Sequence, residues 1–117
     1  MDLYREEILE YYKHPVNFGR PKDYDIKIKE TNASCGDEIT LYFTFGSDNQ
    51  LNHIKFDGHG CAISVASTSM LTEVMLGKNK QQLKKLKLDD VYKLLGGPVN
   101  ASRVKCATIA LKAIEKL

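Results

Sequence analysis

Three cysteines, Cys35, Cys61 and Cys106, carry the most distinctive chemistry in this chain of 117 residues. Thiolates are nucleophiles, and they bind Zn²⁺ and the iron of iron–sulfur clusters. Asp37 adds a carboxylate two residues after Cys35, so three thiolates and one carboxylate would complete a four-coordinate site. The cysteines are 26 and 45 residues apart, which matches no short metal motif. Scattered cysteines with no common role, each buried on its own, are therefore the alternative interpretation.

The residues beside the cysteines favour a metal or a nucleophilic thiol. Glycines follow the first cysteine and precede the second, and a residue without Cβ lets a bulky ligand approach the backbone. Three thiolates and one carboxylate around a divalent metal carry a formal charge of about −2, which basic side chains near the third cysteine would offset. We expect this support from Gly36, Gly60, Arg103 and Lys105.

Apolar residues alternate with polar ones in three segments that follow a loop at residues 15–23. These segments, residues 25–29, 39–45 and 54–56, are predicted to be β-strands. A turn at residues 46–49 separates the second segment from the third. Three strands in succession predict an antiparallel meander.

Helical spacing appears on both sides of the predicted strands. The first helix is expected to begin at Asp2 as its N-cap, to end near residue 13, and to place its tyrosines in the core. A second helix is expected from Ala62, with Gly77 at its C-terminal cap. Residues 78–95 fit one broken helix or two short helices, and a last helix is predicted to continue to Leu117.

Strands followed by helices predict an α+β fold, with a three-stranded antiparallel sheet and helices packed on one of its faces. The length and the absence of linkers or repeats indicate a single domain over residues 1–117. All three cysteines lie at junctions in this prediction, so none is expected to be buried in the middle of an element.

Composition narrows the classes of function. Seventeen Lys and Arg against fifteen Asp and Glu leave a formal charge of +2, spread along the chain, which argues against an electrostatic nucleic-acid binder. The longest apolar run is far short of the roughly 18 residues that suggest a membrane span, and the first residues lack the apolar stretch of a signal peptide. We therefore expect a cytoplasmic protein without membrane contact, whose odd number of cysteines excludes a complete disulfide framework.

Three motifs resemble the IscU/SufU family, which is equivalent to the N-terminal domain of NifU. They are Asn32–Asp37 (NASCGD), Gly58–Ser64 (GHGCAIS) and Arg103–Thr108 (RVKCAT), in this order. The resemblance extends from the first helix to Leu117 and implies an IscU/SufE-like fold. It implies a scaffold that accepts sulfur from a cysteine desulfurase, assembles a transient [2Fe–2S] cluster from Fe²⁺ and sulfur, and passes the cluster to apoproteins. The ligand positions implied by the resemblance are Cys35, Asp37, Cys61 and Cys106.

The sequence mixes features of two branches of that family. Lys105 stands where the IscU branch has a histidine, and the residues after Cys61 are SufU-like. Yet only 44 residues separate Cys61 from Cys106, without the insertion that SufU-type proteins carry there. The scaffold branch implies Cys106 as a principal persulfide acceptor. The SufU branch implies a zinc-dependent sulfurtransferase partner, with Zn²⁺ in the same site and Cys35 as the acceptor.

Other expectations are more limited. His59 is an alternative metal ligand in place of Asp37, although a single loop histidine is commonly a surface residue. The segment Gly96–Asn100 replaces the chaperone-recognition motif of IscU proteins, which argues against a dedicated Hsp70-type partner. A structural zinc domain that binds other proteins is a third alternative for the whole chain. We expect a monomer or a weak dimer.

Overall fold

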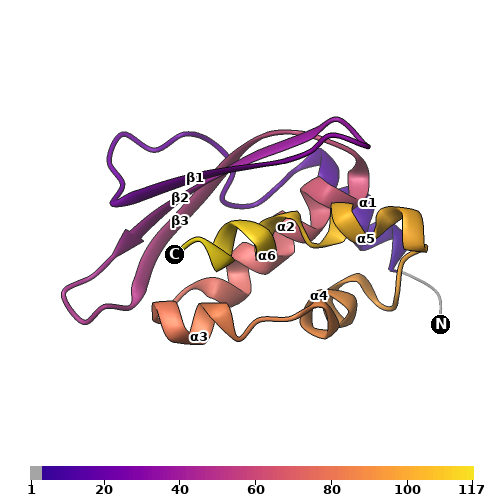
Figure 1. The fold of residues 1–117 in the computed structure, drawn as a ribbon. Coiled ribbons are helices and arrows are strands. Elements are labelled where there is room, and N and C mark those ends of the chain that lie inside the picture. The colour runs from indigo at the N-terminus through magenta and orange to yellow at the C-terminus, as the bar shows by residue number, and fades with distance from the viewer. Residues whose placement is uncertain (1–3) are drawn as a thin grey trace.

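Three antiparallel strands form the sheet in the order β1–β2–β3 (Figure 1). In this computed structural model, which describes residues 4–117, the strands are β1 (Ile26–Asn32), β2 (Asp37–Phe45) and β3 (Leu51–His59). Ile28 pairs with Leu41 and Leu41 with Phe56, so three buried side chains line one face. The predicted meander is confirmed. The strands are longer than predicted because their polar ends continue the pairing without apolar alternation.

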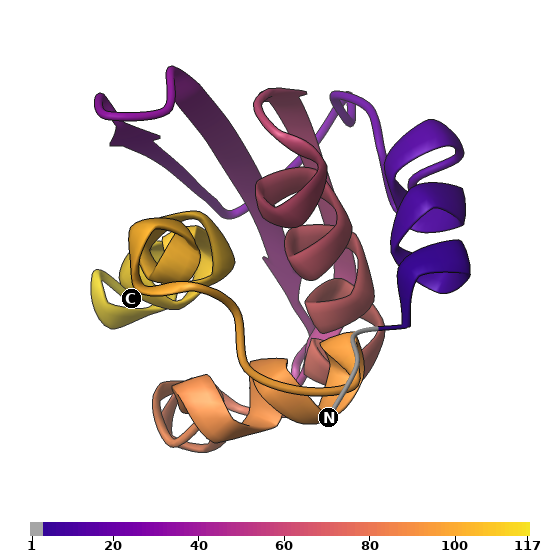
Figure 2. The same ribbon diagram turned by 90° about the vertical axis from the view of Figure 1, so that its right-hand side faces the viewer.

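The helices all lie on one face of this sheet (Figure 1). Figure 2 shows α2 across the sheet, with α1 on one side of it and the C-terminal helices on the other. The predicted α+β fold is therefore confirmed. The helices are α1 (Arg5–Lys13), α2 (Ala62–Met75), α3 (Lys80–Lys84), α4 (Leu88–Leu95), α5 (Val104–Ala107) and α6 (Ile109–Glu115), with a 3₁₀ turn η1 (Ala101–Arg103) before α5.

Helix α2 is the central helix, and it is buried on nearly all sides although it is rich in serine and threonine. The loop after α1 uses two of these hydroxyls. The Val16 N–H donates to Ser69 Oγ at 2.8 Å, and Asn17 Nδ2 donates to Thr72 Oγ1 at 3.0 Å. The same loop covers the free edge of β3, because the Phe56 N–H donates to the Asn17 carbonyl at 2.9 Å.

The side chains that helix α1 buries differ from those predicted. Ile8 is in the core, but Tyr4 and Tyr12 are 51% and 41% exposed. The expectation that the tyrosines join the core is therefore wrong for these two, because only the side of α1 that faces α2 is covered. The predicted cap, Asp2, lies outside the described residues.

Glycines end two of the helices, and Gly77 does so as predicted. Gly77 after α2 and Gly96 after α4 have φ values of +85° and +92°, in the left-handed region that favours glycine. Residues 78–95 form two short helices, which was one of the two predicted alternatives.

The last helix is not continuous as predicted. Thr108 separates α5 from α6, with φ −106° and ψ 6°, and its hydroxyl donates to the Val104 carbonyl at 2.8 Å. Such a bond from a threonine hydroxyl to the carbonyl four residues earlier bends a helix. Within residues 4–117, no helix has the length and apolar character needed to cross a membrane.

Candidate metal centre

The turn between β1 and β2 places the first cysteine. Asn32, the last residue of β1, pairs with Asp37, the first residue of β2, and the Cys35 N–H donates to the Asn32 carbonyl at 3.2 Å. Gly36 completes the turn with φ +69°, where any side chain with a Cβ is strained. Cys35 is therefore held at the tip of the hairpin, where it is half-buried.

The Asp37 carboxylate ties this hairpin to the start of α2. It is 2% exposed, and its Oδ1 accepts a hydrogen bond from the Cys61 N–H at 2.9 Å. Its Oδ2 accepts from Asn32 Nδ2 at 3.2 Å. A Cβ on Gly60 would lie 2.6 Å from Asp37 Oδ1, so only glycine at that position leaves the carboxylate in place.

Cys106 reaches the same place from the C-terminal helices. Its Sγ lies 3.3 Å from the Cys35 Sγ and 3.6 Å from Asn32 Nδ2. The residue is fully buried inside α5, so the prediction that no cysteine is buried within an element is wrong for Cys106. The reason is that α5 packs directly against α2.

Cys35, Asp37 and Cys106 thus form one group whose ligand atoms all lie within 4.8 Å of one another. Cys61 is not a member of this group. It is the half-buried N-cap residue of α2, and its own N–H donates to Asp37 Oδ1. Three of the four predicted ligands are therefore brought together, and the role of the Cys61 sulfur stays a prediction.

The electrostatics of the group depend on its burial. Burial raises the pKa of the Cys106 thiol, and its contacts with Cys35, Cys61 and Asp37 raise that pKa further. The Arg103 guanidinium is exposed, and a hydrogen bond to Cys106, together with the charge that the three cysteine sulfurs carry when ionised, raises its pKa. The predicted role of Arg103, to offset the charge of the ligands, stays a prediction. Lys105 is exposed on α5, and its predicted role stays untested.

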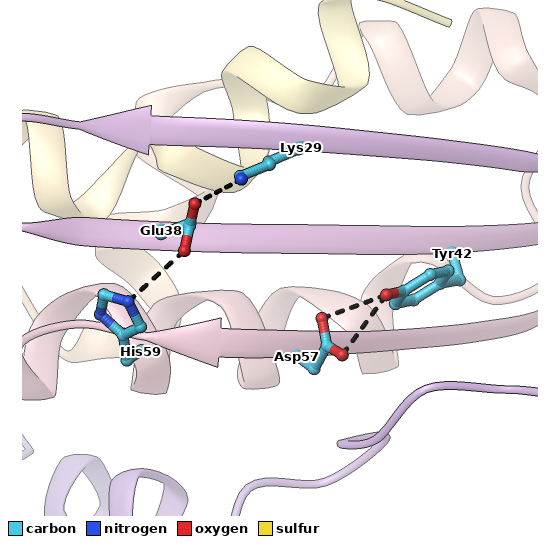
Figure 3. Close-up of polar contacts among 5 residues, drawn as sticks. All are labelled: Lys29, Glu38, Tyr42, Asp57 and His59. Atoms are coloured by element: carbon cyan, nitrogen blue, oxygen red, sulfur yellow. Dashed lines mark hydrogen bonds and ion pairs between the residues drawn. The ribbon is translucent and has the colours of Figure 1, made fainter.

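His59, the predicted alternative to Asp37, lies on the opposite face of the sheet, as does Asp57 (Figure 3). Consecutive strand residues point to opposite faces, so Glu38 points away from Asp37. His59 lies beside Glu38, with 3.4 Å between its Nε2 and Glu38 Oε2, and Lys29 contacts the other Glu38 oxygen. Asp57 accepts from the Tyr42 hydroxyl at 3.3 Å on the same face. His59 is therefore not part of the group and does not replace Asp37.

The donor atoms of the group suit a thiophilic metal. Thiolate sulfur binds both Zn²⁺ and the iron of iron–sulfur clusters, and a carboxylate oxygen is also a ligand of Zn²⁺. The described residues therefore fit a metal ion or a small cluster.

The comparison with known proteins agrees with this geometry. The family model of the NifU-like N-terminal domain matches residues 3–117. The chain belongs to this family. A member from Bacillus subtilis, named zinc-dependent sulfurtransferase SufU, is 35% identical, over 97% of this chain and 88% of its own length. A member from Archaeoglobus fulgidus, named iron–sulfur cluster assembly scaffold protein IscU 1, is 32% identical, over 97% of this chain and 73% of its own length.

A solved structure of another member resembles this chain. A crystal structure described as a putative iron–sulfur cluster assembly scaffold protein for the SUF system of Fervidobacterium islandicum has a TM-score of 0.82 at 32% identity. It covers 97% of this chain and 94% of that one. The alignment with the Bacillus protein is 131 positions long, and that with the Archaeoglobus protein 114. This NifU-like domain has 117 residues, so only the first alignment requires long gaps in it.

Proposed function

We propose that this protein is an iron–sulfur cluster assembly scaffold. It accepts sulfur from a cysteine desulfurase, holds a [2Fe–2S] cluster as its cargo, and passes the cluster to apoproteins. The names of several relatives, among them the Archaeoglobus protein, support this role. The observation that carries the proposal is the group of Cys35, Asp37 and Cys106, drawn together from segments up to 71 residues apart.

The position of the group suits a transient cargo. Asp37 and Cys106 are buried, but Cys35 is half-buried, so the group reaches the surface at Cys35, where iron and sulfur could enter and a cluster could leave. We assign the four ligands to Cys35, Asp37, Cys61 and Cys106. Cys61 supplies the fourth position because its N–H already contacts Asp37, so a small movement of this N-cap brings its sulfur to the others.

Sulfur transfer requires an accessible thiolate. The acceptor thiolate attacks the outer sulfur of the desulfurase persulfide, a new S–S bond forms, and the desulfurase cysteine leaves as a thiolate. Cys106 is buried and its pKa is raised, whereas Cys35 is half-buried. This contrast favours Cys35 as the first acceptor, which the resemblance implies for the SufU branch and not for the scaffold branch. Cys106, the acceptor implied for the scaffold branch, lies next to it at 3.3 Å.

A zinc-dependent sulfurtransferase is the second candidate, because the relative with that name is 35% identical over nearly the whole chain. Zn²⁺ would occupy the same ligands and keep the thiols as thiolates. Relatives named as scaffolds align both without a long gap and with one, so the length of the chain does not separate the two candidates.

Anaerobic reconstitution tests the two candidates. The protein is incubated with Fe²⁺, cysteine and a cysteine desulfurase, and its visible spectrum and metal content are measured. We expect a sulfur-to-iron chromophore with two irons per chain. A colourless protein that keeps one zinc would contradict the scaffold function and support the sulfurtransferase. Mass spectrometry of the desulfurase-treated protein is expected to find the persulfide on Cys35 first, and a persulfide on no cysteine would contradict both candidates.

Replacing Asp37 by alanine is expected to slow the exchange of bound zinc, because an oxygen ligand is weaker than the thiolates. The same change is expected to lower the free energy of unfolding of the metal-free protein by about 1–3 kcal/mol, because the Cys61 N–H and the Asn32 amide lose their acceptor. Exchange is measured with a chromogenic chelator, and stability by urea unfolding. Asp57→Ala, on the other face of the sheet, is the control. Faster zinc release from Asp37→Ala than from the wild type would contradict the prediction.

Several finer properties remain proposals. We infer that residues 1–117 act as one domain, because the family model spans residues 3–117. Cysteine desulfurase and apoprotein acceptors are the partners that the scaffold function requires. The cytoplasmic location, the absence of a dedicated Hsp70-type partner and the monomer or weak dimer stay predictions from the sequence.

A further inference from the structure

One buried side chain touches two of the proposed ligands and has no role in the function described so far. Asn32 is only 7% exposed, and its Nδ2 lies 3.2 Å from Asp37 Oδ2 and 3.6 Å from the Cys106 Sγ. Its other end is also occupied, because the Ser34 hydroxyl donates to Asn32 Oδ1 at 3.1 Å. A buried amide satisfied at both ends has a defined orientation.

The number of donor hydrogens on this amide equals the number of acceptors that face it. An asparagine NH₂ group has two donor hydrogens, and two acceptors face it, one carboxylate oxygen and one sulfur. Ser34 occupies the carbonyl oxygen, which therefore points away from the ligands. The amide thus connects the end of β1, the start of β2 and α5 at the point where the donor group forms.

We propose that Asn32 is a positioning residue that holds the Asp37 carboxylate and the Cys106 sulfur together, ready for the metal ion or cluster. The inference rests on the proposed function, since it deepens the description of the same site. Because both acceptors are ligand atoms, the amide prepares the group before the metal arrives. In a loaded site, an N–H···S bond from Asn32 to Cys106 would withdraw electron density from the sulfur and so tune the metal that Asp37 and Cys106 would hold.

A purely structural role for this side chain is separable from positioning. The turn itself depends on the hydrogen bond from the Cys35 N–H to the Asn32 carbonyl, which is a backbone bond and persists with any side chain at position 32. Removing the amide therefore leaves the hairpin intact and frees the two ligands from each other. Removing the Ser34 hydroxyl affects the other end of the amide and touches no ligand.

The test measures metal binding by Asn32→Ala and Asn32→Asp, with Ser34→Ala as the matched control. Asn32→Asp keeps the shape of the side chain but replaces the donor by an oxygen that repels both ligands. We expect both Asn32 variants to bind Zn²⁺ about 10- to 100-fold more weakly, the range typical of groups that orient metal ligands. In the Co²⁺-loaded protein, the sulfur-to-cobalt charge-transfer band is expected to shift in Asn32→Ala and to stay unchanged in Ser34→Ala.

The possible outcomes separate this proposal from the proposed function. Zinc affinity and a cobalt spectrum equal to those of the wild type in Asn32→Ala would overturn the positioning role and leave the scaffold untouched. A wild-type protein that binds neither metal at its thiols would overturn the function instead. If the variants do not fold, NMR of the wild type decides. Slow exchange of both Asn32 side-chain amide protons, with shifts on addition of Zn²⁺, supports the proposal, and rapid exchange of these protons contradicts it.

Discussion

Cys106→Ser is expected to abolish the thermal stabilisation that zinc gives to the wild-type protein. A ligand at 100 times its Kd stabilises the folded state by about 2.7 kcal/mol, which corresponds to a rise in Tm of roughly 10 °C for a chain of this size. Cys106 is the member of the donor group that closes it from the C-terminal side, 3.3 Å from Cys35. A serine hydroxyl at that position remains protonated and does not replace a thiolate as a zinc ligand. Thermal unfolding is measured with zinc and with a chelator.

Two further variants separate the loss of the ligand from a loss of packing. Cys106→Ala also removes the sulfur but introduces no buried hydroxyl, so both Cys106 variants should lose the response to zinc whatever their metal-free Tm. Ser102→Ala changes an exposed residue of the preceding 3₁₀ turn and should respond as the wild type does. A full zinc-dependent rise of Tm in Cys106→Ser would show that Cys106 is not a ligand.

Gly58→Ala is expected to lower the free energy of unfolding by about 4 kcal/mol or more, a large loss for one added methyl group. Gly58 pairs with Ile39 near the site end of β3 and has φ +127°. A Cβ there would lie only 1.9 Å from the Glu38 carbonyl oxygen, which is backbone and cannot move without opening the β2–β3 pairing. Because Cys61 follows three residues later, the contact of its N–H with Asp37 should be lost as well. Urea unfolding and zinc titration measure the two effects.

Gly77→Ala is the matched control for this substitution. Gly77 also has a positive φ, +85°, but a Cβ there meets nothing within 4 Å. Its replacement should therefore cost only the strain of the left-handed conformation, about 1–2 kcal/mol, and should not change zinc affinity. Equal losses of stability in the two variants would mean that the close approach to Glu38 is not the cause.

The prediction of the fold succeeded where a local pattern reports directly on a local structure. The alternation in residues 39–45 predicted most of β2, and Gly77 correctly marked the end of α2. The ends of strands were underestimated. Glu30, Thr31 and Asn32 belong to β1 because they pair with β2, although their own side chains show no apolar alternation. Pairing between strands is a tertiary property, and polar strand ends carry little local signal of it.

The prediction of the site was less complete. His59 has the right chemistry and the right distance along the sequence from Cys61, but the strand register places it beside Glu38 on the other face of the sheet (Figure 3). Asn32 lies within the first motif and was given no role, because an asparagine before a turn is ordinary in a sequence. Its place in the site depends on its contact with Cys106, which is 74 residues away in the sequence and is visible only in the tertiary structure.

The sequence alone determined the order of the elements and the family resemblance of the three cysteine motifs. Both can be read from residues that are neighbours in the chain. Only the tertiary structure decided which donors meet. The packing of α5 against α2 buries Cys106 and brings it to Cys35, while Cys61 remains at the edge of the group. The distances between segments so far apart in sequence depend on how side chains pack between the helices and the sheet. The helical and strand periodicities of the sequence carry no information on this packing.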